Sequence, residues 1–159
     1  MSRTSTTPDT FDQKMSLEYS HTIMSDKVEG SGGAGEASCP FCNPDGDRIL
    51  ASREHAMAVY DGFPCTEGHT LIVPRRHLAS LFEASEEELR DIWGLIGEVR
   101  KLLIDKYHTD GFNIGVNEGE AAGQTVMHCH LHVIPRRKGD VPDPRGGIRW
   151  VIPEKVKYW

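Results

Sequence analysis

Residues 126–134 read Val-Met-His-Cys-His-Leu-His-Val-Ile, and every second residue from 128 to 132 is a histidine. A two-residue period is typical of a β-strand, because successive side chains of a strand point to opposite faces of its sheet. We therefore expect a strand over 126–134 that Pro135 ends. Three histidines would share one face of this strand: His128, His130 and His132.

This histidine row spans roughly 13 Å on an ideal strand, which is too long for one tetrahedral ion to bind all three rings. The three rings would then have different roles. Neutral imidazole is a good nucleophile toward phosphorus, and a neighbouring protonated ring can stabilise charge or protonate a leaving phosphate. The alternative is a solvent-facing polar strand. Three of the eight histidines in alternate register favour the functional interpretation.

The other predicted elements are three strands and one helix. The β-prone runs are 56–60, 69–73 and 112–116. Ser85 and Glu88 form a capping box, and apolar residues then recur every three or four positions as far as Tyr107, before Gly111 closes the helix. Helix and strands do not alternate along the chain. The class is therefore α+β with an antiparallel sheet.

Length and composition fit one globular domain with a flexible segment. We expect a disordered or flexible tail over 1–37, which is rich in Ser, Thr, Asp and Gly, a domain over 38–138, and an extension over 139–159. The net charge of −6 argues against broad nucleic-acid binding. The sequence shows neither a membrane span nor a signal peptide, so we expect a cytoplasmic protein.

The Cys39-Pro-Phe-Cys42 pair is weak evidence by itself. In a reducing compartment such a pair is a metal site or a redox site more often than a structural disulfide. A thioredoxin-type redox motif follows a strand, whereas a Gly/Ser-rich stretch precedes this pair. Metal binding is therefore the favoured interpretation.

Three segments carry a resemblance to a known family. They are Gly123-Gln-Thr-Val-Met-His-Cys-His-Leu-His-Val-Ile-Pro-Arg136, Asn113-Ile-Gly-Val-Asn-Glu-Gly119, and Tyr60-Asp61 followed by Gly68-His-Thr-Leu-Ile-Val-Pro-Arg-Arg-His77. They resemble, in order, the signature, the strand and turn before it, and the earlier hairpin of the histidine-triad (HIT) family, over about 39–137. The resemblance implies a HIT-like antiparallel sheet of about five strands with one long and one short helix, and a homodimer.

Carried over by position, the resemblance implies a nucleotide hydrolase. His130 takes the place of a nucleophile that attacks the α-phosphate, and His132 that of a phosphate-binding or leaving-group partner. The further implied contacts are Gln124 and Thr125 at the transferring phosphate, Asn117 and the Gly123 backbone at other phosphate oxygens, Asp61 at the ribose hydroxyls, and Phe41 at the base. Asp61 could instead be a plain turn residue, and Phe41 a plain core residue.

Some branches of the family bind a structural zinc ion, and the resemblance extends to its ligands. Here these would be Cys39, Cys42, His77 and His128. Four such ligands make a sound tetrahedral set. The alternative is that the thiols are free and His128 only orients the site. The remaining histidines are not expected to be ligands: His21, His55, His69 and His108.

Several functions remain open. Ala-Gly-Gln-Thr-Val and Ile-Pro-Arg resemble the fragile-histidine-triad branch, which implies dinucleoside polyphosphates as substrates, with Mg²⁺ on the polyphosphate. Nucleoside phosphoramidates or acyl-adenylates would share the nucleotidyl-histidine intermediate. In galactose-phosphate-type nucleotidyltransferases a glutamine replaces His132. The same residues would also fit a nucleotide-binding scaffold without turnover, or a hydrolase that uses zinc-bound water.

Two further features bear on the substrate. The basic groups Arg75-Arg76 and Arg136-Arg137-Lys138 could offset polyphosphate charge if the two strand ends lie together, or could be ordinary solvated strand ends. The 139–159 extension would pack on the domain or on a partner subunit. Its Trp150 or Trp159 could contact a base or that subunit.

Overall fold

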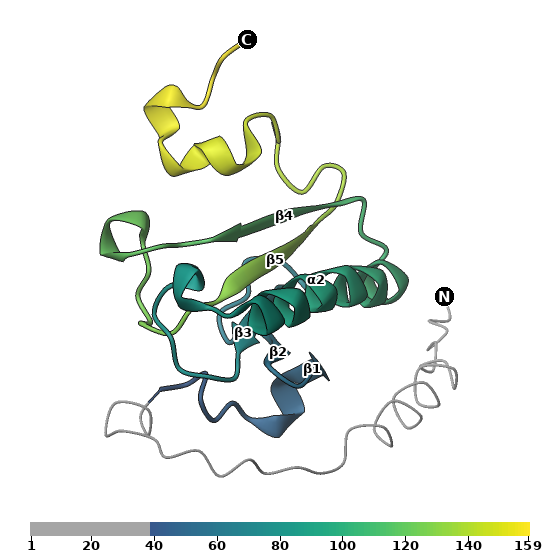
Figure 1. The fold of residues 1–159 in the computed structure, drawn as a ribbon. Coiled ribbons are helices and arrows are strands. Elements are labelled where there is room, and N and C mark those ends of the chain that lie inside the picture. Colours follow the sequence, from purple (N-terminus) through teal and green to yellow (C-terminus); the bar gives the residue numbers. More distant parts are fainter. Residues whose placement is uncertain (1–38) are drawn as a thin grey trace, which may run out of the picture. The chain divides into compact units, whose positions relative to one another are not determined.

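Five strands form one antiparallel sheet in the order β1-β2-β3-β5-β4 (Figure 1). Their bounds are Ile49–Ser52 for β1, Ala56–Tyr60 for β2, Thr70–Pro74 for β3, Gly111–Val116 for β4 and Leu131–Arg136 for β5. This computed structural model describes residues 39–159, so the predicted tail over 1–37 lies outside the described residues. The antiparallel α+β sheet predicted from the sequence is confirmed.

The central strands β2 and β3 are buried on both faces. One face carries Ala56, Ala58 and Ile72 and packs against the long helix α2. The other face carries Met57, Val59, Leu71 and Val73, and the segment around Cys39 and Phe41 covers it. Covering the second face therefore brings the cysteine pair onto the sheet.

Helix α2 spans Glu86–Tyr107 and begins at the predicted capping box. The Ser85 hydroxyl accepts from the Glu88 backbone N–H, and the Glu88 carboxylate accepts from the Ser85 backbone N–H. The helix ends at Tyr107, the last residue of the predicted apolar period, but the residue that closes it is His108 in the left-handed conformation, and not Gly111. In residues 39–159 the other helical segments are 3-10 turns of three to five residues.

The predicted strand over 126–134 is wrong at both ends, because β5 spans Leu131–Arg136. The last pair between β3 and β5 is Ile72 with Leu131. Two residues further along β3, Pro74 has no N–H to donate, and its carbonyl accepts from the His128 ring. Pro135 lies inside β5, but the pairing of β5 with β3 covers only Leu131 to Val133. The missing N–H of Pro135 therefore costs no hydrogen bond to β3.

The extension over 139–159 contacts the sheet beside β4 through a 3-10 turn, Gly147–Val151. Val156 is buried, and two arginines lie over aromatic rings, Arg145 over Trp159 and Arg149 over Tyr158.

Within residues 39–159, no helix is long and apolar enough to cross a membrane.

Candidate functional site

The four predicted zinc ligands come together where β3 ends and just before β5 begins. Sγ of Cys39 lies 3.4 Å from Nδ1 of His128, and Sγ of Cys42 lies 3.5 Å from the same nitrogen and 3.2 Å from Nδ1 of His77. All four donor atoms lie within 4.8 Å of one another. Sulfur and nitrogen atoms bound to one tetrahedral zinc ion lie about 3.3 to 3.8 Å apart. These residues therefore fit a zinc ion.

A hydrogen bond at Nε2 of His128 orients this ring so that Nδ1 faces the two thiols. Nε2 lies 2.9 Å from the carbonyl oxygen of Pro74, and a carbonyl only accepts, so Nε2 carries the proton. Nδ1 is then a lone pair that faces both sulfur atoms. A second hydrogen bond of this kind is the usual way in which proteins orient a metal-binding histidine.

His130 lies next to this cluster and is fixed in one tautomer by it. Its Nδ1 lies 2.8 Å from the carbonyl oxygen of His128, so Nδ1 donates and Nε2 keeps its lone pair. The His130 side chain is almost fully buried. The Phe41 ring lies 4.9 Å from the His130 ring and 5.9 Å from that of His128. The neutral form of this ring therefore presents Nε2 as its unprotonated nitrogen, which is what a nucleophile requires.

His132 is the third member of the row, with its ring 5.2 Å from that of His130. Burial, then repulsion by positive charge on His130 and His69, lowers the pKa of His132 to about 4. The opposing attraction of Asp61 is smaller. His132 is therefore uncharged near neutral pH.

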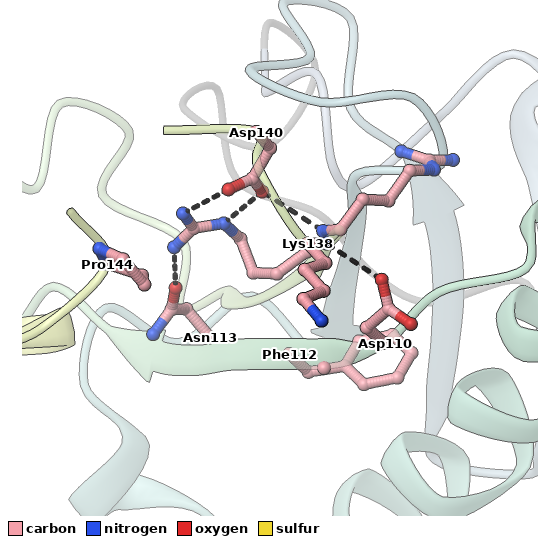
Figure 2. Close-up of a pocket in the computed structure, with 9 residues that line it drawn as sticks. Asp110, Phe112, Asn113, Lys138, Asp140 and Pro144 are labelled. Atoms are coloured by element: carbon pink, nitrogen blue, oxygen red, sulfur yellow. Dashed lines mark hydrogen bonds and ion pairs between the residues drawn. The ribbon is translucent and has the colours of Figure 1, made fainter. Parts of the chain in front are cut away.

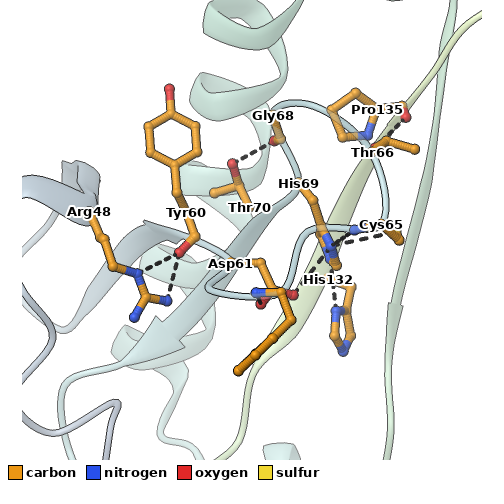
Figure 3. A network of polar contacts seen from close by, with 11 residues as sticks. Arg48, Tyr60, Asp61, Cys65, Thr66, Gly68, His69, Thr70, His132 and Pro135 are labelled. Carbon is orange, nitrogen blue, oxygen red and sulfur yellow. Dashed lines mark hydrogen bonds and ion pairs between the residues drawn. The ribbon is translucent and has the colours of Figure 1, made fainter.

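His132 contacts His69, which in turn contacts Asp61 (Figure 3). The sequence did not predict the part that His69 plays between the other two. Nδ1 of His132 lies 3.0 Å from Nε2 of His69, and Nδ1 of His69 lies 3.2 Å from Oδ2 of Asp61. From the sequence, His69 is at most a polar residue that holds the hairpin. Because Leu71 pairs with His132, His69 lies diagonally opposite His132 on the same face, a relation that only the strand register reveals.

Four residues predicted to contact phosphate lie on the loop before β5 or next to it. Gln124 is buried, donates to the carbonyl oxygens of Ala79 and Val126, and accepts from the Gly119 N–H. Nδ2 of Asn117 lies 3.5 Å from the carbonyl oxygen of Gly123, whose φ is positive. The Thr125 side chain is exposed. The Gln124 amide therefore holds the loop, and its predicted approach to phosphate remains a prediction.

Asp61 and Phe41 each have the structural role weighed from the sequence and also contact a histidine of the site. Asp61 accepts from the Phe63 N–H in a turn and also contacts His69. Phe41 belongs to the core that covers β2 and β3 and also touches the His130 ring. A structural role and a site role are therefore compatible for both residues.

The basic groups are engaged elsewhere. An open cavity of 270 Å³ at the ends of β4 and β5 is lined by Arg136, Arg137 and Lys138, and none of the predicted site residues lines it (Figure 2). Arg136 binds Asp140 and Asn113, and Arg76 binds Glu88. These partners favour the interpretation of these arginines as structural strand-end residues.

Fold and site together define an α+β protein that gathers histidines at the end of an antiparallel sheet, beside a Cys₂His₂ cluster. Comparison with known proteins agrees with this class. The family model of the HIT domain matches residues 45–139. The chain belongs to the HIT domain family.

Three known proteins illustrate the similarity. A crystal structure of a Zn-bound histidine triad family protein from Mycobacterium smegmatis is 32% identical, with a TM-score of 0.60, over 73% of this chain and 91% of that one. A histidine triad nucleotide-binding protein from Candida albicans is 32% identical, with a TM-score of 0.56, over 64% and 76%. The nitrilase and fragile histidine triad fusion protein NitFhit of Caenorhabditis elegans is 34% identical over 64% of this chain and 23% of that protein.

Proposed function

We propose that this protein hydrolyses the α-phosphate bond of nucleotide compounds through a nucleotidyl intermediate on His130, and that its substrates are dinucleoside polyphosphates. One observation carries the proposal. The hydrogen bond from Nδ1 of His130 to the His128 carbonyl leaves Nε2 as a lone pair, in a buried position beside a second imidazole. The name of the Candida albicans relative, a nucleotide-binding protein, supports nucleotides as the ligand class.

The reaction has two displacements. Nε2 of His130 forms a bond to the α-phosphorus while the bond to the bridging oxygen breaks, and the leaving phosphate takes that electron pair. Water then attacks the same phosphorus and breaks the N–P bond, which returns the lone pair to His130, and the His132 ring, neutral after the first step, takes the proton that the water loses. Two inversions give retention at phosphorus.

His132 would supply the proton that the leaving group needs. The ring is uncharged at rest, because burial keeps its pKa at about 4. The negative charge of a polyphosphate raises the pKa of a neighbouring imidazole, so substrate binding favours protonation of His132. Protonated His132 then donates to the departing oxygen. Protonation of His132 near neutral pH therefore depends on the bound anionic substrate.

The other contacts follow the family positions. Asp61 would bind the ribose hydroxyls and Phe41 the base, while Asn117, Gly123, Gln124 and Thr125 would approach the phosphates. Mg²⁺ would enter, if required, with the polyphosphate. The whole domain would span residues 38–138 and would form a homodimer.

A zinc ion on the Cys₂His₂ cluster would have a structural role: when bound, it neutralises the thiolates and cross-links the chain. Cys39 and Cys42 hold the segment that carries Phe41, and His128 precedes the nucleophile by two residues. The Zn-bound Mycobacterium smegmatis relative supports this assignment. No reaction step uses the ion.

The test is turnover against diadenosine polyphosphates, nucleoside phosphoramidates and adenylated conjugates, for the wild type and His130→Gly. We expect diadenosine polyphosphates to be the best substrates and the variant to lose at least about a thousand-fold in kcat. His55→Ala is the matched control, because its side chain is partly exposed and belongs to none of the proposed site residues. Acid-labile labelling of the wild type by an α-³²P nucleotide would identify the N–P intermediate.

Each other outcome has a distinct meaning. Turnover that survives in His130→Gly would refute the nucleophile. Preference for phosphoramidates or adenylated conjugates would keep the intermediate and change the substrate class. Transfer to added phosphate instead of water would indicate a nucleotidyltransferase. Nucleotide binding without turnover by the wild type would indicate a binding protein.

A further inference from the structure

The C-terminal extension lies on the same face of the sheet as the His132 ring. In the ladder of β4 and β5, Gly115 pairs with His132, so a side chain at position 115 would point to the His132 side. A Cβ built on Gly115 would lie 3.7 Å from Cδ1 of Ile148. Ile148 belongs to the 3-10 turn Gly147–Val151 of the extension (Figure 1). The extension therefore covers β4 directly beside His132.

A second contact gives the extension the same position. Asn113 precedes Gly115 by two residues on β4 and so shares its face, and a Cβ built on Gly147 would lie 3.5 Å from Nδ2 of Asn113. The Asn113 side chain accepts a hydrogen bond from Arg136, which follows His132 by four residues on β5. Four residues of a strand span about 13 Å. The extension therefore runs along the face that leads from His132 to Arg136.

An open cavity of 500 Å³ lies where the extension meets the end of β5. Its volume is within the usual range of small-molecule sites. Most of its lining is apolar and comes from the extension: Val141, Pro142, Pro144, Gly147 and Trp150. The cavity therefore offers apolar contact and one large aromatic ring.

The charged residues of the lining already have partners. Arg136 donates two hydrogen bonds to the carboxylate of Asp140, and Asp143 accepts two from the Arg145 side chain. A ligand phosphate would have to compete with these carboxylates for the guanidinium groups. The cavity is therefore better suited to an uncharged planar group than to a phosphate.

The Trp150 ring is held in place and still exposes much of its surface. Its Nε1 donates to the carbonyl oxygen of Arg145 at 3.1 Å, and 48% of the residue is exposed. The turn before it closes tightly, because Gly146 has a φ of +90° and a Cβ there would collide with buried Val156. A fixed and exposed indole is a stacking platform for a nucleobase.

The strand order puts this cavity on the opposite side of the histidines from the first nucleoside. Phe41 packs over β2 and β3, and Asp61 follows β2, so the proposed base and ribose contacts lie on that side of β5. Strand β4 is the neighbour of β5 on its other side. A dinucleoside polyphosphate carries one nucleoside at each end of its phosphate chain. Its two ends would therefore meet different parts of this face.

We propose that the cavity at Trp150 binds the base of the leaving nucleotide of a dinucleoside polyphosphate. The inference rests on the proposed function, which positions the first nucleoside at Phe41 and Asp61 and the leaving oxygen at His132. The second base stacks on Trp150, and the phosphate chain passes Gly115, which has no side chain to obstruct it. The extension thereby selects nucleotides with a nucleoside at both ends over those with one.

The experiment compares diadenosine tetraphosphate with adenosine tetraphosphate, which has the same phosphate chain and lacks the second nucleoside. Calorimetry measures binding in the His130→Gly background, and kcat/KM is measured in full-length proteins that keep His130. The variants are Trp150→Ala and Trp150→Phe. Trp93→Ala is the matched control, because Trp93 is an exposed tryptophan on α2, which packs against the opposite face of the sheet.

We expect Trp150→Ala to weaken diadenosine tetraphosphate binding about ten-fold and to lower its kcat/KM by a similar factor, with adenosine tetraphosphate unaffected. Unchanged binding of adenosine tetraphosphate also shows that the variant is folded. Trp150→Phe keeps a stacking ring and should retain most of the preference, and Trp93→Ala should retain all of it. Equal weakening of both ligands in Trp150→Ala, or weakening of neither, would overturn the proposal.

The binding measurement separates this proposal from the proposed function. If the wild type turns over neither ligand, hydrolysis fails, yet a preference for the dinucleoside that depends on Trp150 still supports the second base position. Turnover without such a preference leaves hydrolysis standing and refutes the second base position, and binding of neither ligand refutes it too. A lower oligomeric state of Trp150→Ala in sedimentation, with ligand preference unchanged, would assign the cavity to a second copy of the chain and overturn the proposal.

Discussion

The ring of His132 makes the stability of the protein depend on pH in a predictable direction. Burial, and then positive charge on His130 and His69, lower the pKa of this ring to about 4 in the folded state. An unfolded chain titrates histidine near 6.5. Between these values the unfolded state binds a proton that the folded state does not. The stabilisation is therefore fully present above about pH 6.5 and is lost as the pH falls toward 4.

The size of the effect follows from the two pKa values. Proton linkage between about 6.5 and about 4 gives a loss of about 2.5 kcal/mol between about pH 8 and about pH 4.5. The His132 side chain is only partly buried, so water screens some of this interaction. We therefore expect about 1 to 2 kcal/mol.

Urea unfolding over this pH range, for the wild type and His132→Gln, measures the effect. The glutamine amide does not titrate, so the free energy of unfolding of the variant should fall by about 1 to 2 kcal/mol less on acidification. Groups that do not interact with His132 contribute equally in both proteins and cancel in the difference. Parallel pH curves would refute the assignment, as would a His132 ring that titrates near its unfolded value in NMR spectra.

Three further predictions concern stability. In zinc-containing buffer, Cys42→Ala should lower the thermal midpoint seen by circular dichroism, and chelation should destabilise the wild type much more than this variant, because His77 and His128 then lose their common ion. Gln124→Ala should lower the free energy of unfolding in urea by about 1 to 3 kcal/mol, because the Gly119 N–H loses its partner. Thr125→Ala is the control: this side chain is exposed, so the free energy of unfolding should change by less than about 0.5 kcal/mol. Gly68→Ala should lower the free energy of unfolding by about 1 to 3 kcal/mol, because φ is +82° and the new Cβ would lie 2.8 Å from the Tyr107 ring. Gly97→Ala, which has open space around it in α2, is the control and should raise the free energy of unfolding by about 0.5 to 1 kcal/mol.

Local signals predicted the elements that depend on neighbouring residues. The capping box at Ser85 and the apolar period of α2 are both observed, because each needs only residues three or four positions apart. The period is less reliable for single positions. Trp93 follows Leu89 by four positions and precedes Ile96 by three, so the period includes it, yet this side chain is 60% exposed, whereas Leu95 is fully buried. Packing against the sheet, and not hydrophobicity alone, selects the buried face.

Long-range pairing explains what the sequence did not reveal. The alternation in 126–134 predicted a strand, but the ladder with β3 ends at Ile72 and Leu131, ahead of Pro74 in a distant segment. Strand β1 was not predicted as a separate element, since its register shifts between Ile49 and Ala51 and it lacks a regular alternation. The partnership of His69 with His132 likewise depends on register.

The corrected end of β5 changes the physical explanation of the histidine row. A continuous strand would present His128, His130 and His132 as three similar side chains on one face. Because the chain leaves the ladder before Leu131, the backbone at 128 is free to turn, and its carbonyl accepts from the His130 ring while its own ring faces two thiols. The Cys129 N–H donates to the carbonyl of Leu78, next to the fourth cluster residue, His77, and holds that turn in place. The different surroundings of the three rings, on which their proposed roles rest, therefore arise from the loss of strand geometry at 128 to 130, and not from the spacing of a strand.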